Sequence, residues 1–127
     1  MFDTNSGRLV TVLPAVQDAD DPYYDSARKR VYIHGGEGYI SVFRQVDADH
    51  YKLLAKIHSA IGARTAGYFG KGRKGFGRFY LAVSARADHG AEVWIYTVQR
   101  TSATKETKAL LVSHAAHQDP YCAFNII

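Results

Sequence analysis

Acidic side chains and histidines recur at the ends of the predicted strands of this sequence, where they could support chemistry. Carboxylate and imidazole groups bind divalent cations and serve as general acids and bases. Their spacing along the chain matches no recognised metal-binding motif, and isolated polar residues in loops are usually hydrated. We therefore assign no catalytic residue; the candidates for binding a ligand or metal are Asp20, Asp21, His34, Glu37, His58, Arg64 and His89, with Asp18 and Asp88 nearby.

A basic, glycine-rich stretch, GKGRKGFG at residues 70–77, could bind an anion instead. Glycines let backbone amides approach a phosphate, and lysines add positive charge. The stretch lacks the Gly-Lys-Ser/Thr ending of a phosphate-binding loop, and no helix is expected after it, so a flexible basic turn is favoured. If it binds single-stranded nucleic acid, the residues are Lys71, Arg73, Lys74, Phe76 and Arg78.

Two segments resemble the strand signatures of an RNA-recognition module: KGFGRFY at 74–80 and VYIHGG at 31–36. That module needs a helix after each signature, whereas glycine-containing turns and β-rich segments follow both. The ring of Phe79 also comes one position late, which turns it to the other side of a strand. We therefore interpret both segments as copies of one repeated strand.

The C-terminal tail offers a third, weaker candidate. Cys122 is the chain's one cysteine, which excludes an intramolecular disulfide framework and a multi-cysteine zinc site. His114 and His117 could join it in a soft metal site, but a His-x-x-His spacing alone is a weak signal.

The composition indicates one packed, strand-rich domain. Hydrophobic residues make up 46% of the 127 residues and aromatic residues 13%, and aromatic and branched side chains favour strands. The net charge of +4 is a mild excess that favours contact with phosphates without requiring it. No stretch is long and apolar enough to span a membrane, and the N-terminus carries no targeting signal, so we expect a soluble protein of unknown compartment.

A repeat of about four strands positions these residues. RVYI, GYISVF and YKLLAKI, within residues 30–57, recur as RFYLAV, EVWIYTV and KALLVS, within residues 78–113. YKLLAKI alone also fits a short amphipathic helix. DPYYDS and ARTAGYF precede the two sets as first strands, and RLVTVL at 8–13 is a further expected strand, after a tight turn at Asn5-Ser6-Gly7. The two sets are about 48 residues apart. A repeat of this length with four short antiparallel strands is typical of β-propeller blades.

DADDPYYDSARKRVYIHGGEGYISVF, with YKLLAKI, GARTAGYF and AEVWIYTV, is similar to the C-terminal part of bacterial seven-bladed propellers of the YVTN repeat type, which are lactonase-like. The resemblance covers residues 2–99. With the repeat, it gives a blade remnant at 1–14, blades at 20–57 and 62–113, and a C-terminal tail at 114–127. Residues 100–127 match nothing in that family. The resemblance also implies that the acidic and histidine candidates share one loop face, where Arg64 either binds an anion or pairs with Asp20 or Asp21; we favour the pairing.

Two and a third blades leave sheet faces and strand edges uncovered, so we expect a homo-oligomer, with a trimer as the first choice because it supplies about seven blades. The expected function is a non-enzymatic propeller-type binding or scaffold module that self-associates to complete a ring, with its ligand unassigned and no cofactor. The alternatives are a lactonase-like hydrolase dependent on a divalent cation, and a single-stranded nucleic-acid binder through the basic loop at 71–78. Nucleic acid is the less favoured partner, and no membrane partner is expected.

Overall fold

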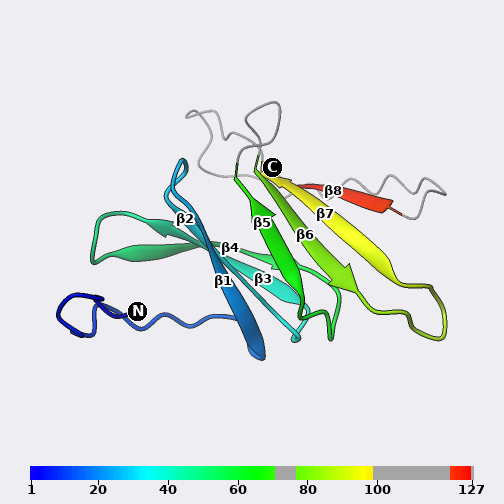
Figure 1. Ribbon diagram of the computed structural model, residues 1–127, viewed down its shortest axis with the longest axis horizontal. Coiled ribbons are helices and arrows are strands. Elements are labelled where there is room, and N and C mark those ends of the chain that lie inside the picture. The colour runs from blue at the N-terminus through cyan, green and yellow to red at the C-terminus, as the bar shows by residue number, and fades with distance from the viewer. Residues whose placement is uncertain (71–76, 99–120, 127) are drawn as a thin grey trace. The chain divides into compact units, whose positions relative to one another are not determined.

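The structure is a computed structural model that describes residues 1–70, 77–98 and 121–126. This described part of the chain consists of β-strands and connecting loops without a helix, so the expectation of an all-β protein is confirmed (Figure 1). The chain divides into two compact units, residues 1–61 and 62–127. None of the described segments is a helix long and apolar enough to cross a membrane.

The first unit contains one four-stranded antiparallel sheet, in which each strand pairs with its neighbour in sequence (Figure 1). All four predicted strands are found, and YKLLAKI is a strand rather than a helix. This segment pairs with the third strand along its length. The register shifts at a bulge between Val42 and Phe43. The strands are β1 (Ala19–Asp25), β2 (Arg30–Gly35), β3 (Tyr39–Gln45) and β4 (Tyr51–His58).

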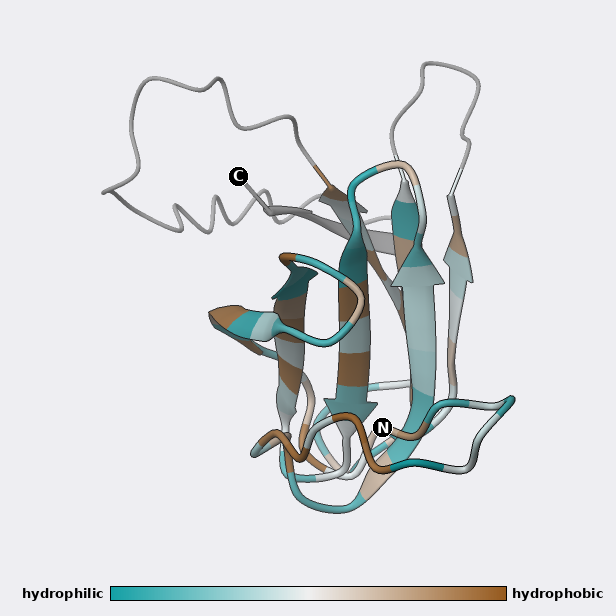
Figure 2. Ribbon diagram, turned by 90° about the vertical axis from the view of Figure 1, so that its left-hand side faces the viewer, coloured by the Kyte–Doolittle hydropathy of each residue, from teal (hydrophilic) through white to brown (hydrophobic). Residues whose placement is uncertain are grey.

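Both faces of the first sheet contain buried side chains along its middle strands. On one face lie Tyr32, Ile40, Val42 and Ile57, all nearly inaccessible to solvent. Phe43 is buried on the other face, because successive residues of a strand point to opposite sides. Figure 2 shows the resulting alternation of apolar and polar bands along the strands. A sheet with apolar residues on both faces must be covered on both sides to be stable in water.

The turns at one end of this sheet are built by aspartates. The Oδ1 atom of Asp25 accepts hydrogen bonds from the backbone N–H groups of Ala27 (3.0 Å) and Arg28 (3.2 Å), which closes the β1–β2 turn. A short acidic side chain that bonds the backbone two and three residues ahead mimics a turn of the main chain. Lys29 completes the turn with a φ of 51°, in the left-handed region. Chain reversal is thus encoded locally, by one residue.

The second unit contains β5 (Ala66–Phe69), β6 (Arg78–Val83) and β7 (Glu92–Val98), which pair in antiparallel order where strands were predicted. A fourth strand, β8 (Tyr121–Ile126), lies beside β7 but runs parallel to it. The sheet is therefore not wholly antiparallel. The four strands of a propeller blade would all be antiparallel. The segment expected to be the fourth strand, residues 108–113, lies outside the described residues.

The core of the second sheet lies on one of its faces. Phe79 and Leu81 of β6 are almost fully buried, as are Tyr96 and Val98 of β7. The rings of Phe79 and Tyr96 meet edge to face with their centroids 6.3 Å apart. Burial also raises the pKa of the Tyr96 hydroxyl, because the phenolate would lose its hydration there. This tyrosine is a neutral core residue.

The predicted strand at residues 8–13 is wrong. In the structure only Leu9 forms a β-bridge, with Phe2. The first residues instead form a closed loop, in which the N-terminal ammonium donates a hydrogen bond of 2.7 Å to the carbonyl oxygen of Thr11. The predicted turn within this loop is present, and Gly7 has a positive φ of 69° there. A strand needs a partner along its whole length, and local sequence cannot supply one.

Candidate functional site

Several of the predicted site residues lie at one end of the first sheet, where β1 and β3 begin and β2 and β4 end. The register brings Ala19, Gly35, Tyr39 and His58 into line across the four strands at this end. We call it the acidic end, after the carboxylates of Asp18, Asp20, Asp21 and Glu37 that lie in or beside it.

Glu37 occupies the β2–β3 turn, and both of its carboxylate oxygens are hydrogen-bonded. Oε2 accepts from the backbone N–H of Gln17 at 2.8 Å, and Oε1 accepts from the Lys56 ammonium at 2.9 Å. The Gln17 hydrogen bond, followed by the contact with Lys56, lowers the pKa of Glu37 below its ordinary value. An ionised carboxylate tied to the segment before β1 and to β4 positions three parts of the chain. These contacts give Glu37 a structural role, and its role as a ligand stays a prediction.

Lys56 was not singled out from the sequence, although it is central to this end. Besides its ion pair with Glu37, its ammonium lies 4.5 Å from the centroid of the Tyr39 ring, in cation–π contact. The His58 ring also contacts Tyr39, edge to face, with the ring centroids 5.3 Å apart. The only signal in the sequence was the alternation of YKLLAKI, and the register of β3 with β4 decides which of its residues reach Tyr39.

The two histidines of the first unit that were predicted as site residues, His34 and His58, do not come together. His34 is fully buried, on the face that carries Ile40 and Ile57, and its ring centroid lies 6.2 Å from that of Tyr23. His58 follows Ile57 in β4 and therefore points to the opposite face, where it is exposed. The structure thus separates a pair that the sequence placed on one loop face.

Asp20 and Asp21 lie in the exposed first half of β1, where the register with β2 shifts between Ala19 and Pro22. Both carboxylates influence Tyr23. The pKa of the Tyr23 hydroxyl is raised mainly by its burial and further by the negative charges of Asp21 and Asp20. The pairing expected between Arg64 and one of these aspartates would join the two units, and it stays a prediction. Arg64 itself is exposed in the loop before β5.

His89 and Asp88 occupy the β6–β7 loop of the second unit. The Nδ1 atom of His89 donates to the Gly90 carbonyl at 2.8 Å, and its Nε2 lies 3.9 Å from an oxygen of Asp88. Glu92, 4.0 Å from His89, accepts a hydrogen bond of 2.6 Å from the indole N–H of Trp94. Nowhere in residues 1–70 or 77–98 do three or more His, Cys, Asp or Glu residues gather into a group that could hold a metal ion.

Of the residues predicted to bind nucleic acid, the structure describes only Arg78. Lys71, Arg73, Lys74 and Phe76 lie outside the described residues, and so do His114 and His117. Arg78 is exposed at the start of β6, where it lies opposite Phe69 and Thr97. Cys122 belongs to β8.

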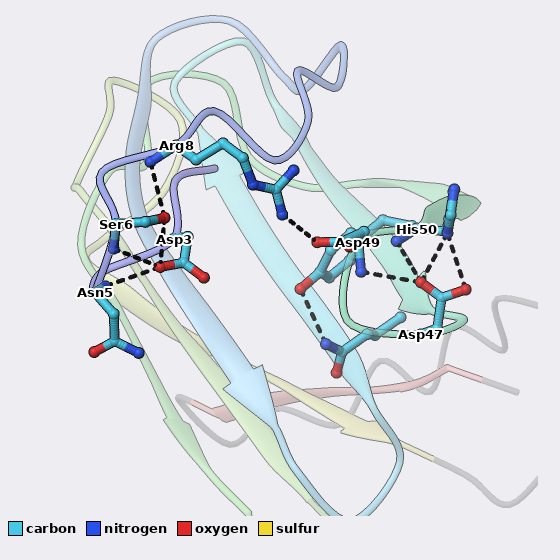
Figure 3. A network of polar contacts seen from close by, with 9 residues as sticks. Asp3, Asn5, Ser6, Arg8, Asp47, Asp49 and His50 are labelled. Atoms are coloured by element: carbon cyan, nitrogen blue, oxygen red, sulfur yellow. Dashed lines mark hydrogen bonds and ion pairs between the residues drawn. The ribbon is translucent and has the colours of Figure 1, made fainter.

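A second polar network, missed from the sequence, joins the N-terminal loop to the far end of the first sheet (Figure 3). The Arg8 guanidinium lies 3.2 Å from a carboxylate oxygen of Asp49, which belongs to the β3–β4 turn. Within that turn, Oδ1 of Asp47 accepts from the backbone N–H groups of Asp49 and His50, both at 2.9 Å, and lies 2.8 Å from the His50 ring. Asp3 holds the N-terminal loop in the same manner, by accepting from Asn5 and Ser6.

We expect the unfolding free energy to fall as acid protonates these turn carboxylates. Hydrogen bonds, chiefly from Ser6 to Asp3, from Asp49 to Asp47 and from Gln17 to Glu37, lower all three pKa values from ordinary values of 3.8, 3.8 and 4.5. A depressed pKa gives stability that is present above the ordinary value and is lost as the pH falls through the folded value. Urea unfolding between pH 6 and pH 2.5 measures this. A loss below pH 4.5 that is unchanged in the Glu37→Gln/Asp47→Asn double variant contradicts it.

Comparison with known proteins gives no relative: no protein-family model, no curated protein and no solved structure matches the chain. The function must be argued from its own residues.

Proposed function

We propose that this chain is part of a β-propeller similar to the YVTN type, and that it acts as a non-enzymatic binding or scaffold module which self-associates to complete a ring. The observation that carries the proposal is the recurrence, in both units, of three consecutive strands that pair in antiparallel order. Tyr32 lies opposite Tyr23 on β1 and Val42 on β3, whereas Tyr80, 48 positions later, lies opposite Gly67 and Ile95 on β5 and β7. Recurrence of one sheet along a chain is the signature of blade-like repeats.

A repeat among the turns supports the same proposal. Asp3, Asp25 and Asp47 are spaced 22 residues apart in the sequence, from 3 to 25 and from 25 to 47. Each accepts backbone hydrogen bonds from the residues two and three positions ahead. The first of these turns lies in the segment interpreted as the remnant of a preceding blade. It shares its hydrogen-bond pattern with the β3–β4 turn, although no strand follows it at residues 8–13.

An uncovered face of the second sheet supports self-association. Tyr80, Ala82, Val93 and Ile95 lie on the face opposite the core, where they are half-buried or exposed, and Phe69 beside them is 66% exposed. In the first sheet the equivalent positions are buried: Tyr32, His34, Ile40 and Val42. A largely apolar face of this kind commonly marks an interface with another protein. In a ring of blades the neighbouring blade would cover it.

Size-exclusion chromatography with light scattering tests the proposal. We expect a mass three times the 14.1 kDa of one chain for the purified protein. Phe69→Asp, which puts a charge on the uncovered face, is expected to lower the mass to that of one chain while the circular dichroism spectrum is retained. Val46→Asp is the matched control, because Val46 is similarly exposed, at 57%, but lies in the β3–β4 turn. A monodisperse monomer of the unmodified protein would refute the ring.

A further inference from the structure

A row of three positive side chains crosses the first sheet near the end opposite the acidic end. Arg30 of β2 lies directly opposite Arg44 of β3, and Arg44 lies directly opposite Lys52 of β4. Directly opposed residues of antiparallel strands point to the same face, with their Cβ atoms about 4.5–5.5 Å apart. We call Arg30, Arg44 and Lys52 the basic row. The sequence gives no hint of it, because only the strand register brings these three residues together.

Two of the three residues of the basic row are exposed and have no ionic partner among the described residues. Arg44 and Lys52 are exposed, and Arg30 is half-buried. Within the described residues, neither Arg44 nor Lys52 forms an ion pair. Unlike Glu37 at the acidic end, which meets Lys56, Arg44 and Lys52 face solvent.

The nearest carboxylates are already engaged elsewhere. Asp25 lies opposite Arg30 in the register, but its Oδ2 is 2.9 Å from the Arg28 guanidinium and its Oδ1 accepts two backbone hydrogen bonds. In the neighbouring β3–β4 turn, Asp49 contacts Arg8, and Asp47 contacts His50. In the part of the chain that the structure describes, no carboxylate therefore forms an ion pair with Arg44 or Lys52.

Like charges placed directly opposite each other destabilise a sheet, so such a row needs a reason that lies outside the fold. We propose that the basic row binds the phosphate backbone of a nucleic acid. Neighbouring strands are about 4.8 Å apart, so the row presents three charges in a line of roughly 10 Å, which a linear polyanion can follow. Guanidinium groups match phosphate oxygens with two parallel hydrogen bonds, and two of the three residues are arginines.

This inference goes beyond the ring and does not rest on it. It also differs from nucleic-acid binding through the loop at 71–78, which belongs to the other unit. The chain's net charge of +4 would attract any polyanion from a distance, but a local row predicts that specific side chains carry the contact.

Fluorescence anisotropy with a labelled single-stranded oligonucleotide tests the row. Each phosphate contact with a single strand lowers log K by about 0.7 per unit of log salt, so three contacts predict about a twentyfold loss of affinity between 50 and 200 mM salt. For the Arg44→Gln/Lys52→Gln variant we expect weaker binding at low salt and only about a threefold loss over the same range. Its urea midpoint should not fall, because the change removes repulsion.

Arg8→Gln/Lys56→Gln is the matched control: it removes the same two charges, but both residues are ion-paired and lie outside the row. We expect it to retain the salt dependence of the unmodified protein. The proposal is overturned if the two double variants lose affinity equally, which would indicate net charge alone, or if the unmodified protein does not bind. Loss of binding only on Lys71→Gln/Lys74→Gln, or equal binding of polyglutamate, would also overturn it.

Discussion

Replacing Phe43 by alanine is expected to cost about 3–5 kcal/mol of the free energy of unfolding, the usual range for removing a buried aromatic ring. Phe43 is 1% exposed in the centre of β3, directly opposite Val31 and Leu53. Truncation removes the buried ring and leaves a cavity that the paired strands cannot close, because their register is fixed by hydrogen bonds on both sides. A loss of this size is a large part of the stability of a small domain.

Urea denaturation followed by circular dichroism measures the effect. The matched control is Leu53→Ala, because Leu53 is the cross-strand neighbour of Phe43 but is 47% exposed. We expect it to cost less than about 1 kcal/mol, as surface substitutions do. Equal losses for the two variants would show that this face of the sheet is not packed as described.

Replacing Asp25 by alanine is expected to cost about 3 kcal/mol. Asp25 is 3% exposed, and its partner Arg28 has a side chain only 15% exposed. Removing one member of a buried ion pair leaves the other charge without compensation, which is more costly than losing the pair's attraction. The substitution also removes the two hydrogen bonds from Ala27 and Arg28 that close the β1–β2 turn.

The three aspartate turns supply their own controls for this prediction. Asp47→Ala removes the same pattern of backbone hydrogen bonds from an exposed turn, so its effect on the urea midpoint should be clearly smaller. Asp25→Asn should lie between the two, because the amide oxygen can still accept the backbone hydrogen bonds but the charge is lost. If Asp25→Ala lowers the free energy of unfolding no more than Asp47→Ala does, the buried ion pair of Asp25 with Arg28 contributes nothing to stability.

The strands were predictable because their signals are local. Alternating apolar residues in EVWIYTV and RFYLAV, bounded by glycine and polar turns, indicate β-structure without knowledge of any partner. The predicted strand at 8–13 shows the same alternation and was wrong, since forming a strand also depends on a neighbour. The parallel direction of β8 had no signal, because the direction of pairing is a property of two distant segments.

The candidate sites were predictable only in part, for a related reason. Residue types identified Glu37 and His58, but not the contacts of Glu37 with Gln17 and Lys56, which depend on strand register. His34 was a plausible ligand by type, and the alternation of side chains along β2 places it in the core. The basic row was missed because nothing in the sequence relates Arg30 to Arg44 and Lys52 until three strands are aligned.

The aspartate turns also bear on how quickly the protein can assemble. Every pairing in the first sheet joins strands that are consecutive in the chain, through turns of a few residues. Contacts between residues close in sequence cost little loop-closure entropy and form early, whereas β7 and β8 are separated by 22 residues, from 99 to 120. We therefore expect folding to proceed hairpin by hairpin from β1 to β4, with the pairing of β8 and β7 as the slow, late event.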